Sequence, residues 1–227
     1  MRRQDIIDAL ERVELPVFEP VVQFQEEFGG CMLPEHQQFR YFDLLLYTPD
    51  RVLDPRSRLL ERFGKEPVES AIHAQELNGT WFFECGEMSR SSPFFVELSQ
   101  AGALCVGYSL DEPFEVAPSV EHWLETRALD SETRGTWQYL KGKSWLGPAP
   151  GEALARWLDG TFQPLPGAYH HFESWWEGDD LRIQLRWFWD PQRRTGGDLG
   201  AWMRPGGDVT RARTHLAAML AVVPSPE

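Results

Sequence analysis

The chain has 227 residues, of which 42% are hydrophobic and 25% charged, and it contains ten Trp and 14 Phe. This composition excludes a disordered, collagen-like or low-complexity chain. The formal net charge is −13 at pH 7, and the excess is uneven. Residues 1–128 hold 23 acidic and 11 basic residues, a net charge of −12, whereas residues 129–227 hold 12 and 11, a net charge of −1.

The acidic first part narrows the classes of partner. Phosphate contacts need clustered cations, so nucleic acid and anionic membranes fit this surface poorly. A basic protein fits it better, because opposite potentials speed encounter and suppress wrong partners. The alternative is that the charge only keeps the protein soluble and monomeric.

The cysteines and the apolar stretches indicate the compartment. Cys31, Cys85 and Cys105 are widely spaced and odd in number, which favours free thiols in a reducing compartment over a disulfide scaffold. Asp5 and Asp8 interrupt any apolar signal-peptide region, and no stretch approaches the length of a membrane helix. We therefore expect a cytoplasmic protein with no membrane partner.

The residue pattern up to position 129 predicts helices first and then mostly short strands. The apolar spacing and the Gly and Pro positions give helices at residues 4–13, 20–28, 54–64 and 118–129, and strands at 39–47, 71–75, 80–85, 94–98 and 103–108. Asn78-Gly79 predicts a hairpin turn, because both residues tolerate positive φ. We expect an acidic loop at residues 111–115, just before the last of these helices.

The composition shifts near Asp130. The segments expected beyond it are a short helix at 151–159, strands at 169–176 and 181–189 joined by a turn at 177–180, and a last helix that begins after Asp208 and ends before Pro224. In the second strand Arg182, Gln184 and Arg186 alternate with apolar residues, as in a half-exposed antiparallel strand. An isolated hairpin is marginal in water. We therefore expect residues 130–227 to extend the sheet and core of residues 1–129 in a single globular unit.

The motifs indicate no enzyme. Gly142-Lys143-Ser144 resembles the end of a phosphate-binding loop, but Trp137 stands where that loop needs a glycine. His170-His171-x-Glu173 is the densest group of metal-ligand residue types, yet on a strand at most two of the three converge, and a structural zinc needs four. We expect no catalytic residue, no metal and no organic cofactor.

Four tryptophans allow two interpretations. Cross-strand aromatic pairs in a packed sheet account for them, and this is the favoured interpretation. They also suit a stacking platform for a sugar or a peptide. The four residues are Trp175, Trp176, Trp187 and Trp189.

The order of the expected elements resembles a known family. Two helices lead into an aromatic-Gly-Gly segment, short strands follow, and a small-residue segment precedes the next helix. The segments are Phe24-Gln25-Glu26-Glu27-Phe28-Gly29-Gly30, Trp81-Phe82-Phe83-Glu84-Cys85-Gly86, Leu104-Cys105-Val106-Gly107 and Val116-Ala117-Pro118-Ser119. Over residues 4–129 this arrangement resembles the SUKH superfamily, which includes bacterial immunity proteins of polymorphic toxin systems and fungal cell-wall regulators. Residues 130–227 match no pattern of that family.

The resemblance implies an α+β fold with a mixed, mostly antiparallel sheet and helices packed on it. It also implies a non-enzymatic immunity protein that inhibits a toxin. The acidic first part fits this role independently, because a toxin that acts on nucleic acid is basic and an acidic inhibitor blocks it by steric and electrostatic means. The acidic residues expected to face such a partner are Glu84, Glu87, Asp111, Glu112 and Glu115. Two alternatives stay open: a carbohydrate or cell-wall-linked binding protein that uses the tryptophans, and a hydrolase with an acidic cleft.

Overall fold

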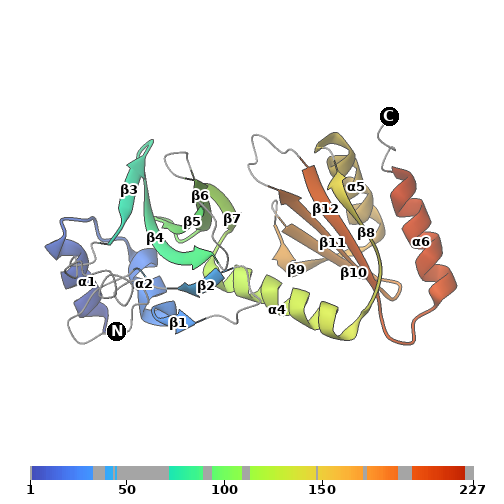
Figure 1. Cartoon of the computed structure of the whole chain (residues 1–227), viewed down its shortest axis with the longest axis horizontal. Coiled ribbons are helices and arrows are strands. Elements are labelled where there is room, and N and C mark those ends of the chain that lie inside the picture. The colour runs from blue at the N-terminus through green and yellow to red at the C-terminus, as the bar shows by residue number, and fades with distance from the viewer. Residues whose placement is uncertain are drawn as a thin grey trace, which may run out of the picture. The chain divides into compact units, whose positions relative to one another are not determined.

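The computed structural model describes residues 2–32, 39–42, 44, 72–88, 94–108, 113–146, 148–170, 173–188 and 196–222. These residues form two compact units, Met1–Glu115 and Val116–Glu227, called the first and second unit below (Figure 1). Each unit has its own sheet, and nine strand pairs in the described part of the chain are antiparallel. The α+β class is confirmed.

The prediction that residues 130–227 extend the sheet of residues 1–129 is wrong. The strands that follow residue 137 form a separate sheet, so they do not extend the first one. The helix expected at 118–129 runs on to Thr136 and belongs to the second unit. It therefore lies outside the unit that holds most of the SUKH-like segments, and the resemblance itself stays a prediction.

The first unit opens with two helices, α1 (Arg3–Arg12) and α2 (Glu19–Phe28). Its described strands are β1 (Cys31–Met32), β2 (Phe39–Phe42), β3 (Ala74–Leu77), β4 (Thr80–Met88), β5 (Phe94–Ser99), β6 (Leu104–Tyr108) and β7 (Phe114–Ala117). They are ordered β1-β2-β4-β5-β6-β7, and β3 also pairs with β4. The turn at Asn78-Gly79 is confirmed, with φ values of 52° and 80°. The helix expected at 54–64 lies outside the described residues.

The two faces of the first sheet differ in chemistry. On one face Phe83 of β4 is paired in register with Leu98 of β5, and both are buried. Phe18, at the start of α2, meets Phe83 edge to face, with ring centroids 6.1 Å apart. On the other face the register aligns Glu84, Glu97 and Cys105 on β4, β5 and β6. The first face is thus an ordinary apolar core, and the second carries buried carboxylates.

The second unit has a five-stranded sheet with the order β8-β12-β11-β10-β9. Its elements are α4 (Val120–Thr136), β8 (Gln138–Leu146), α5 (Pro148–Thr161), β9 (Gln163–Tyr169), β10 (Glu173–Gly178), β11 (Leu181–Phe188), β12 (Gly196–Met203) and α6 (Val209–Val222). The hairpin turn between β10 and β11 is confirmed, with positive φ at Asp179 and Asp180. Asp208 caps α6 as expected, because its side chain accepts the N–H groups of Thr210 and Arg211.

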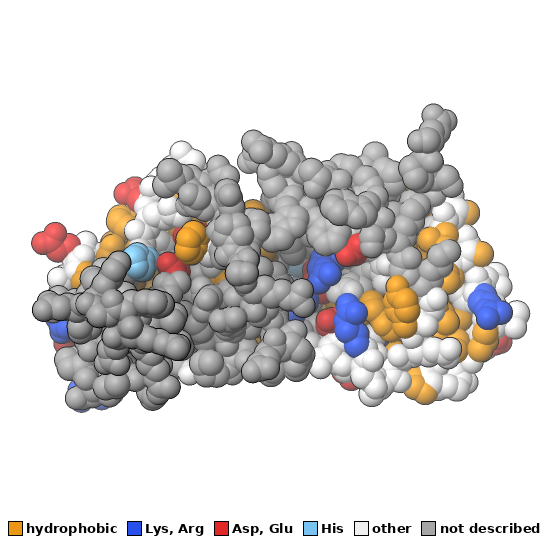
Figure 2. Space-filling model, viewed as in Figure 1, with side chains coloured by type: hydrophobic (Ala, Val, Ile, Leu, Met, Phe, Trp, Pro, Cys, Tyr) orange, Lys and Arg blue, Asp and Glu red, His pale blue; other side chains and the backbone are white. Residues whose placement is uncertain are grey.

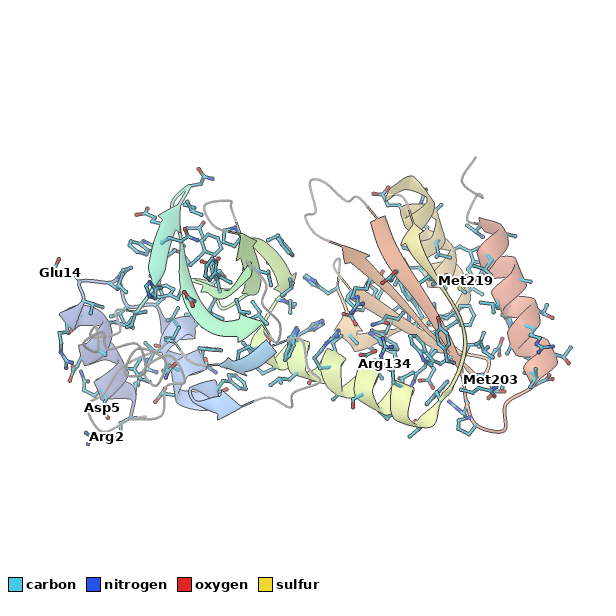
Figure 3. All side chains as sticks on the ribbon, in the orientation of Figure 1. Arg2, Asp5, Glu14, Arg134, Met203 and Met219 are labelled. Carbon is cyan, nitrogen blue, oxygen red and sulfur yellow. The ribbon has the colours of Figure 1, made fainter. Side chains whose placement is uncertain are left out.

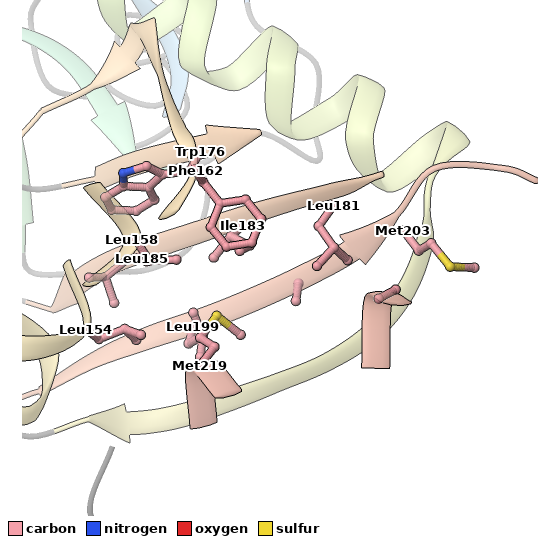
Figure 4. Close-up of a cluster of buried hydrophobic side chains, with 12 residues drawn as sticks. Leu154, Leu158, Phe162, Trp176, Leu181, Ile183, Leu185, Leu199, Met203 and Met219 are labelled. Atoms are coloured by element: carbon pink, nitrogen blue, oxygen red, sulfur yellow. The ribbon is translucent and has the colours of Figure 1, made fainter. Parts of the chain in front are cut away.

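Helices cover both faces of the second sheet (Figure 1). The α5 and α6 helices pack on one face and enclose the larger apolar cluster (Figure 4). Its buried members are Leu154, Leu158, Phe162, Trp176, Leu181, Ile183, Leu185, Leu199, Ala201, Met203, Ala212 and Met219. On the other face Leu129 of α4 packs against a smaller cluster of Ala168, Trp175 and Trp202. This second face is therefore covered, and the expectation that Gln184 lies on a half-exposed face is wrong.

Candidate functional site

Of the five acidic residues expected to face a basic partner, the structure describes the side chains of two. Glu84 is 9% exposed, because it lies on β4 directly opposite Glu97 of β5. Glu115 is half-buried in β7, where a loop was expected. The expectations that Glu84 is exposed and that Glu115 lies on a loop are therefore wrong, and a role of these two residues in partner binding stays a prediction. The side chain of Glu87, and Asp111 and Glu112 as a whole, lie outside the described residues.

The tryptophan platform is also corrected. Trp175 and Trp176 are 0% and 1% exposed, so neither presents a ring face to a ligand. Trp175 stacks on Trp202, with ring centroids 5.4 Å apart, and Trp176 lies in the cluster under α5 and α6. The core interpretation is confirmed for these two residues. The side chains of Trp187 and Trp189 lie outside the described residues.

The acidic excess belongs to the first unit. It holds 21 acidic and 10 basic residues, a net charge of −11, whereas the second unit holds 14 and 12, a net charge of −2. Figure 2 shows Lys and Arg side chains among hydrophobic and acidic ones on the second unit. The second unit is thus close to neutral, and any strong electrostatic attraction of a basic partner comes from the first.

Among the described residues of the first unit, exposed carboxylates concentrate on its two helices and at the end of α1. Residues 2–28 include seven acidic and three basic residues, and two of the three cations are already paired. Arg2 pairs with Asp5 at the start of α1 (Figure 3), and Arg3 pairs with Glu19 and Glu26. Four exposed carboxylates have no ion pair in the described part of the chain, and together they are called the acidic surface: Asp8, Glu11, Glu14 and Glu27.

Glu14 stands at an unusual backbone position. It follows α1 with a φ of 59°, in the left-handed region, and its side chain is exposed (Figure 3). The N–H of Leu15 reaches back to the carbonyl of Leu10 at 3.0 Å and closes the helix. Glycine is the usual residue at such a helix end, and a carboxylate there also meets the negative end of the helix dipole. Glu14 therefore contributes surface charge at a position where it weakens the fold.

A buried ion pair lies between α4 and the second sheet. Arg127 of α4 pairs with Glu173 of β10, and their side chains are 10% and 8% exposed. Glu173 Oε1 also accepts Trp175 Nε1 at 2.9 Å and Gln184 Nε2 at 2.7 Å. Burial by itself raises the pKa of Glu173, but the charges of Arg127 and Arg186 and these two hydrogen bonds outweigh it and lower the pKa. Glu173 is therefore an ionised structural carboxylate.

The ion pair bears on the possible metal-ligand group His170-His171-x-Glu173, because it engages Glu173. Glu173 is engaged by Arg127, and the His170 ring lies against His122, with ring centroids 5.8 Å apart. His171 lies outside the described residues. Among the residues that the structure describes, no three His, Cys, Asp or Glu side chains are grouped so as to hold a metal ion.

A different environment surrounds Glu97, a residue that the sequence did not single out. Its side chain is 6% exposed, and its Oε1 accepts Gln75 Nε2 at 2.8 Å. Its Oε2 accepts no hydrogen bond from the described residues. A Cβ at Gly107 would lie 2.6 Å from this oxygen. Burial, with the charge of Glu84, raises the pKa of Glu97 to about 7, although the bond from Gln75 opposes the shift.

The chemistry open to Glu97 is limited by its packing. A carboxyl group that titrates near neutral pH has the proton affinity of a general acid or base. However, Oε2 is buried and lies close to the backbone of Gly107, where an added Cβ would be only 2.6 Å away, so this oxygen is not open to solvent. Glu97 is therefore a proton-binding group inside the fold.

The two neighbouring thiols are inert. Cys85 and Cys105 are buried on β4 and β6, which flank β5. Two strand spacings separate their backbones by about 10 Å, beyond the reach of a disulfide. Burial raises the pKa of both thiols, that of Cys105 to about 12. Cys31 is the exposed thiol.

Comparisons with known proteins assign no family to the chain. Neither the protein-family models, nor the curated proteins, nor the solved structures give a match. In the described part of the chain, no helix combines the length and the apolar character that crossing a bilayer requires. The function is therefore argued from charge, burial and geometry.

Proposed function

We propose that the chain is a non-enzymatic protein that binds a basic protein through its acidic first unit. The observation that carries the proposal is the separation of charge, −11 on the first unit against −2 on the second. A potential of one sign on one compact unit attracts an oppositely charged partner and orients its approach. The exposed carboxylates Asp8, Glu11, Glu14 and Glu27 are the described groups available for this contact.

The SUKH-like order of elements supports a specific form of this function, an immunity protein. Toxin domains that act on nucleic acid carry basic surfaces, because phosphate contacts need cations. An acidic unit that covers such a surface blocks the toxin by steric and electrostatic means and needs no chemistry of its own. Glu14 agrees with this role, because a carboxylate at a strained helix end favours binding over stability.

The experiment compares two charge reversals that have the same formal size. Glu11→Lys/Glu14→Lys changes the first unit by +4, and Glu121→Lys/Glu125→Lys makes the same change on exposed positions of α4 in the second unit. Lysines near the end of α1 suit its dipole, so folding should persist. The partner is first captured from the producing cells with the wild-type chain as bait, and is then tested by growth in co-expression and by association kinetics at low and high salt.

We expect the first pair of substitutions to slow association on the order of tenfold at low salt, to flatten the salt dependence and to weaken protection of the cells. The second pair should leave all three close to wild type. Equal effects of the two pairs would show that only total charge matters. Wild-type salt dependence in the first variant would contradict the proposal.

A further inference from the structure

Two buried glutamates in this protein have opposite surroundings. Glu173 receives a guanidinium and two N–H donors, an environment suited to a carboxylate anion. Glu97 receives one donor, the amide of Gln75, and only on Oε1. A neutral carboxylic acid has one carbonyl oxygen that accepts and one hydroxyl that donates. Glu97 thus receives one donor and, from the described residues, no cation and no second donor, so its surroundings stabilise an anion far less than those of Glu173 do.

Among the residues that the structure describes, the groups that face Glu97 carry no positive charge. Gln75 faces it from β3, and Glu84 and Cys85 from β4. The β6 strand contributes Cys105 and Gly107, which has no side chain, and Pro113 lies next to that glycine. The charge of Glu115, on β7, raises the pKa of Cys105. Every titratable group in this set is an acid. A second negative charge on Glu97 would therefore lie in a desolvated site beside other acids, which is strongly unfavourable.

We propose that Glu97 holds a proton in the folded first unit below neutral pH and that loss of this proton as pH rises opens the sheet around β5. The hydrogen bond from Gln75 to Glu97 spans β4, so it links β3 to β5 across the strand between them. An ionised Glu97 gains water on opening, and the strands that bury it lose their pairing. Protonation of Glu97 thus controls the opening of the first sheet, and this effect needs no partner.

The sign of the effect follows from the two pKa values. The unfolded carboxyl titrates near 4.5 and the folded one near 7. Stability is fully present below pH 4.5 and is lost as pH rises towards 7, because only the folded state keeps the proton in that interval. Between pH 5.5 and pH 8 these values raise the opening equilibrium roughly 30-fold.

The buried cysteines provide the measurement. All three cysteines lie in the first unit, so in the full chain with Cys31→Ser, alkylation of Cys85 and Cys105 reports opening of this unit alone. Iodoacetamide labelling followed by mass spectrometry compares wild type with Glu97→Gln at pH 5.5 and pH 8. The change in thiolate chemistry with pH is common to both proteins, so it cancels in the ratio of their rates.

We expect the ratio of wild-type to Glu97→Gln labelling to rise roughly 30-fold from pH 5.5 to pH 8. Glu76→Gln removes an exposed carboxylate of β3 in the same unit, and it should follow wild type at both pH values. Carbon-13 NMR of wild type labelled at the Glu carboxyl carbons should show one Glu that titrates near pH 7, even if Glu97→Gln fails to fold. A constant labelling ratio, or no Glu titrating above pH 6, would overturn the proposal.

Discussion

Removal of Arg127 tests whether the buried ion pair holds α4 on the second sheet. Arg127→Met keeps most of the length of the side chain and removes the guanidinium that faces Glu173. The carboxylate, which is 8% exposed in wild type, then has lost its ion-pair partner. Breaking a buried pair by removing one partner typically destabilises a protein by about 3–5 kcal/mol, because the remaining charge stays desolvated.

The expected loss lies at the lower end of this range. Glu173 keeps its hydrogen bonds from Trp175 and Gln184, and Arg186 still contributes a favourable charge. We therefore expect the free energy of unfolding of the second unit to fall by about 3 kcal/mol at pH 7. The folded-state pKa of Glu173 is lowered in wild type, so its contribution is present above the unfolded pKa and is lost as pH falls. The difference between wild type and variant should therefore shrink towards pH 4.

The assay is urea unfolding followed by tryptophan fluorescence. Nine of the ten tryptophans belong to the second unit, so the signal reports mainly that unit. The matched control is Arg134→Met on the same helix, because Arg134 is 52% exposed and its ion pair with Asp130 contributes little, within about 0.5 kcal/mol. Arg127→Met/Glu173→Gln should recover most of the loss. A loss at pH 7 no larger than that of the Arg134 variant would refute the reasoning.

Three further outcomes are expected. The fragment Val116–Glu227 should unfold cooperatively by circular dichroism, because helices cover both faces of its sheet; aggregation would show that it depends on the first unit. Glu14→Gly should stabilise the first unit by about 1 kcal/mol in urea unfolding followed by thiol labelling, since glycine tolerates the positive φ; no gain would mean that the left-handed position is not strained. Gly107→Ala should destabilise the first unit by about 1–3 kcal/mol, because the new Cβ would meet Glu97 Oε2. Gly135→Ala, on a helix with open space around it, should stabilise the second unit by about 0.5–1 kcal/mol. The reverse order of the two effects would contradict this packing.

Local signals in the sequence located most helices and both tight turns. Asn78-Gly79 and the acidic turn at Asp179 and Asp180 adopt the positive φ values that hairpins need, and Asp208 caps the last helix. These features depend on a few neighbouring residues, so the sequence contains what determines them. The two-unit organisation depends on which strands pair, which local patterns do not encode.

The β12 strand shows why the second sheet was missed. Its glycines are typical of a loop, yet it lies between β8 and β11 as a central strand. Gly200 makes room within the strand for the Trp202 ring, because a Cβ at Gly200 would lie 2.2 Å from that ring two residues along β12. The β8 strand was missed because Lys141 and Lys143 interrupt its apolar pattern, and such residues are normal on an edge strand.

The net charge of the candidate binding unit could be predicted from the sequence, but the residues that expose this charge could not. The sequence places the acidic excess in the first part correctly, because counting needs no structure. Alternation along β4 and β5 does not tell whether the polar face is open or covered, so Glu84 looked exposed and Glu97 went unnoticed. The helical carboxylates Asp8 and Glu11 were overlooked because acidic residues on an amphipathic helix are the usual solvent-facing pattern.

The two buried glutamates give the two units opposite responses to acid. Protonation of Glu173 removes its attraction to Arg127, so the second unit loses stability as pH falls through the lowered folded pKa. Glu97 is neutral when folded, so the first unit gains stability as pH falls from 7 towards 4.5. A measurement on the whole chain mixes these slopes and can show a flat profile. Thiols in the first unit and tryptophans in the second separate them, which allows each carboxylate to be tested in the intact protein.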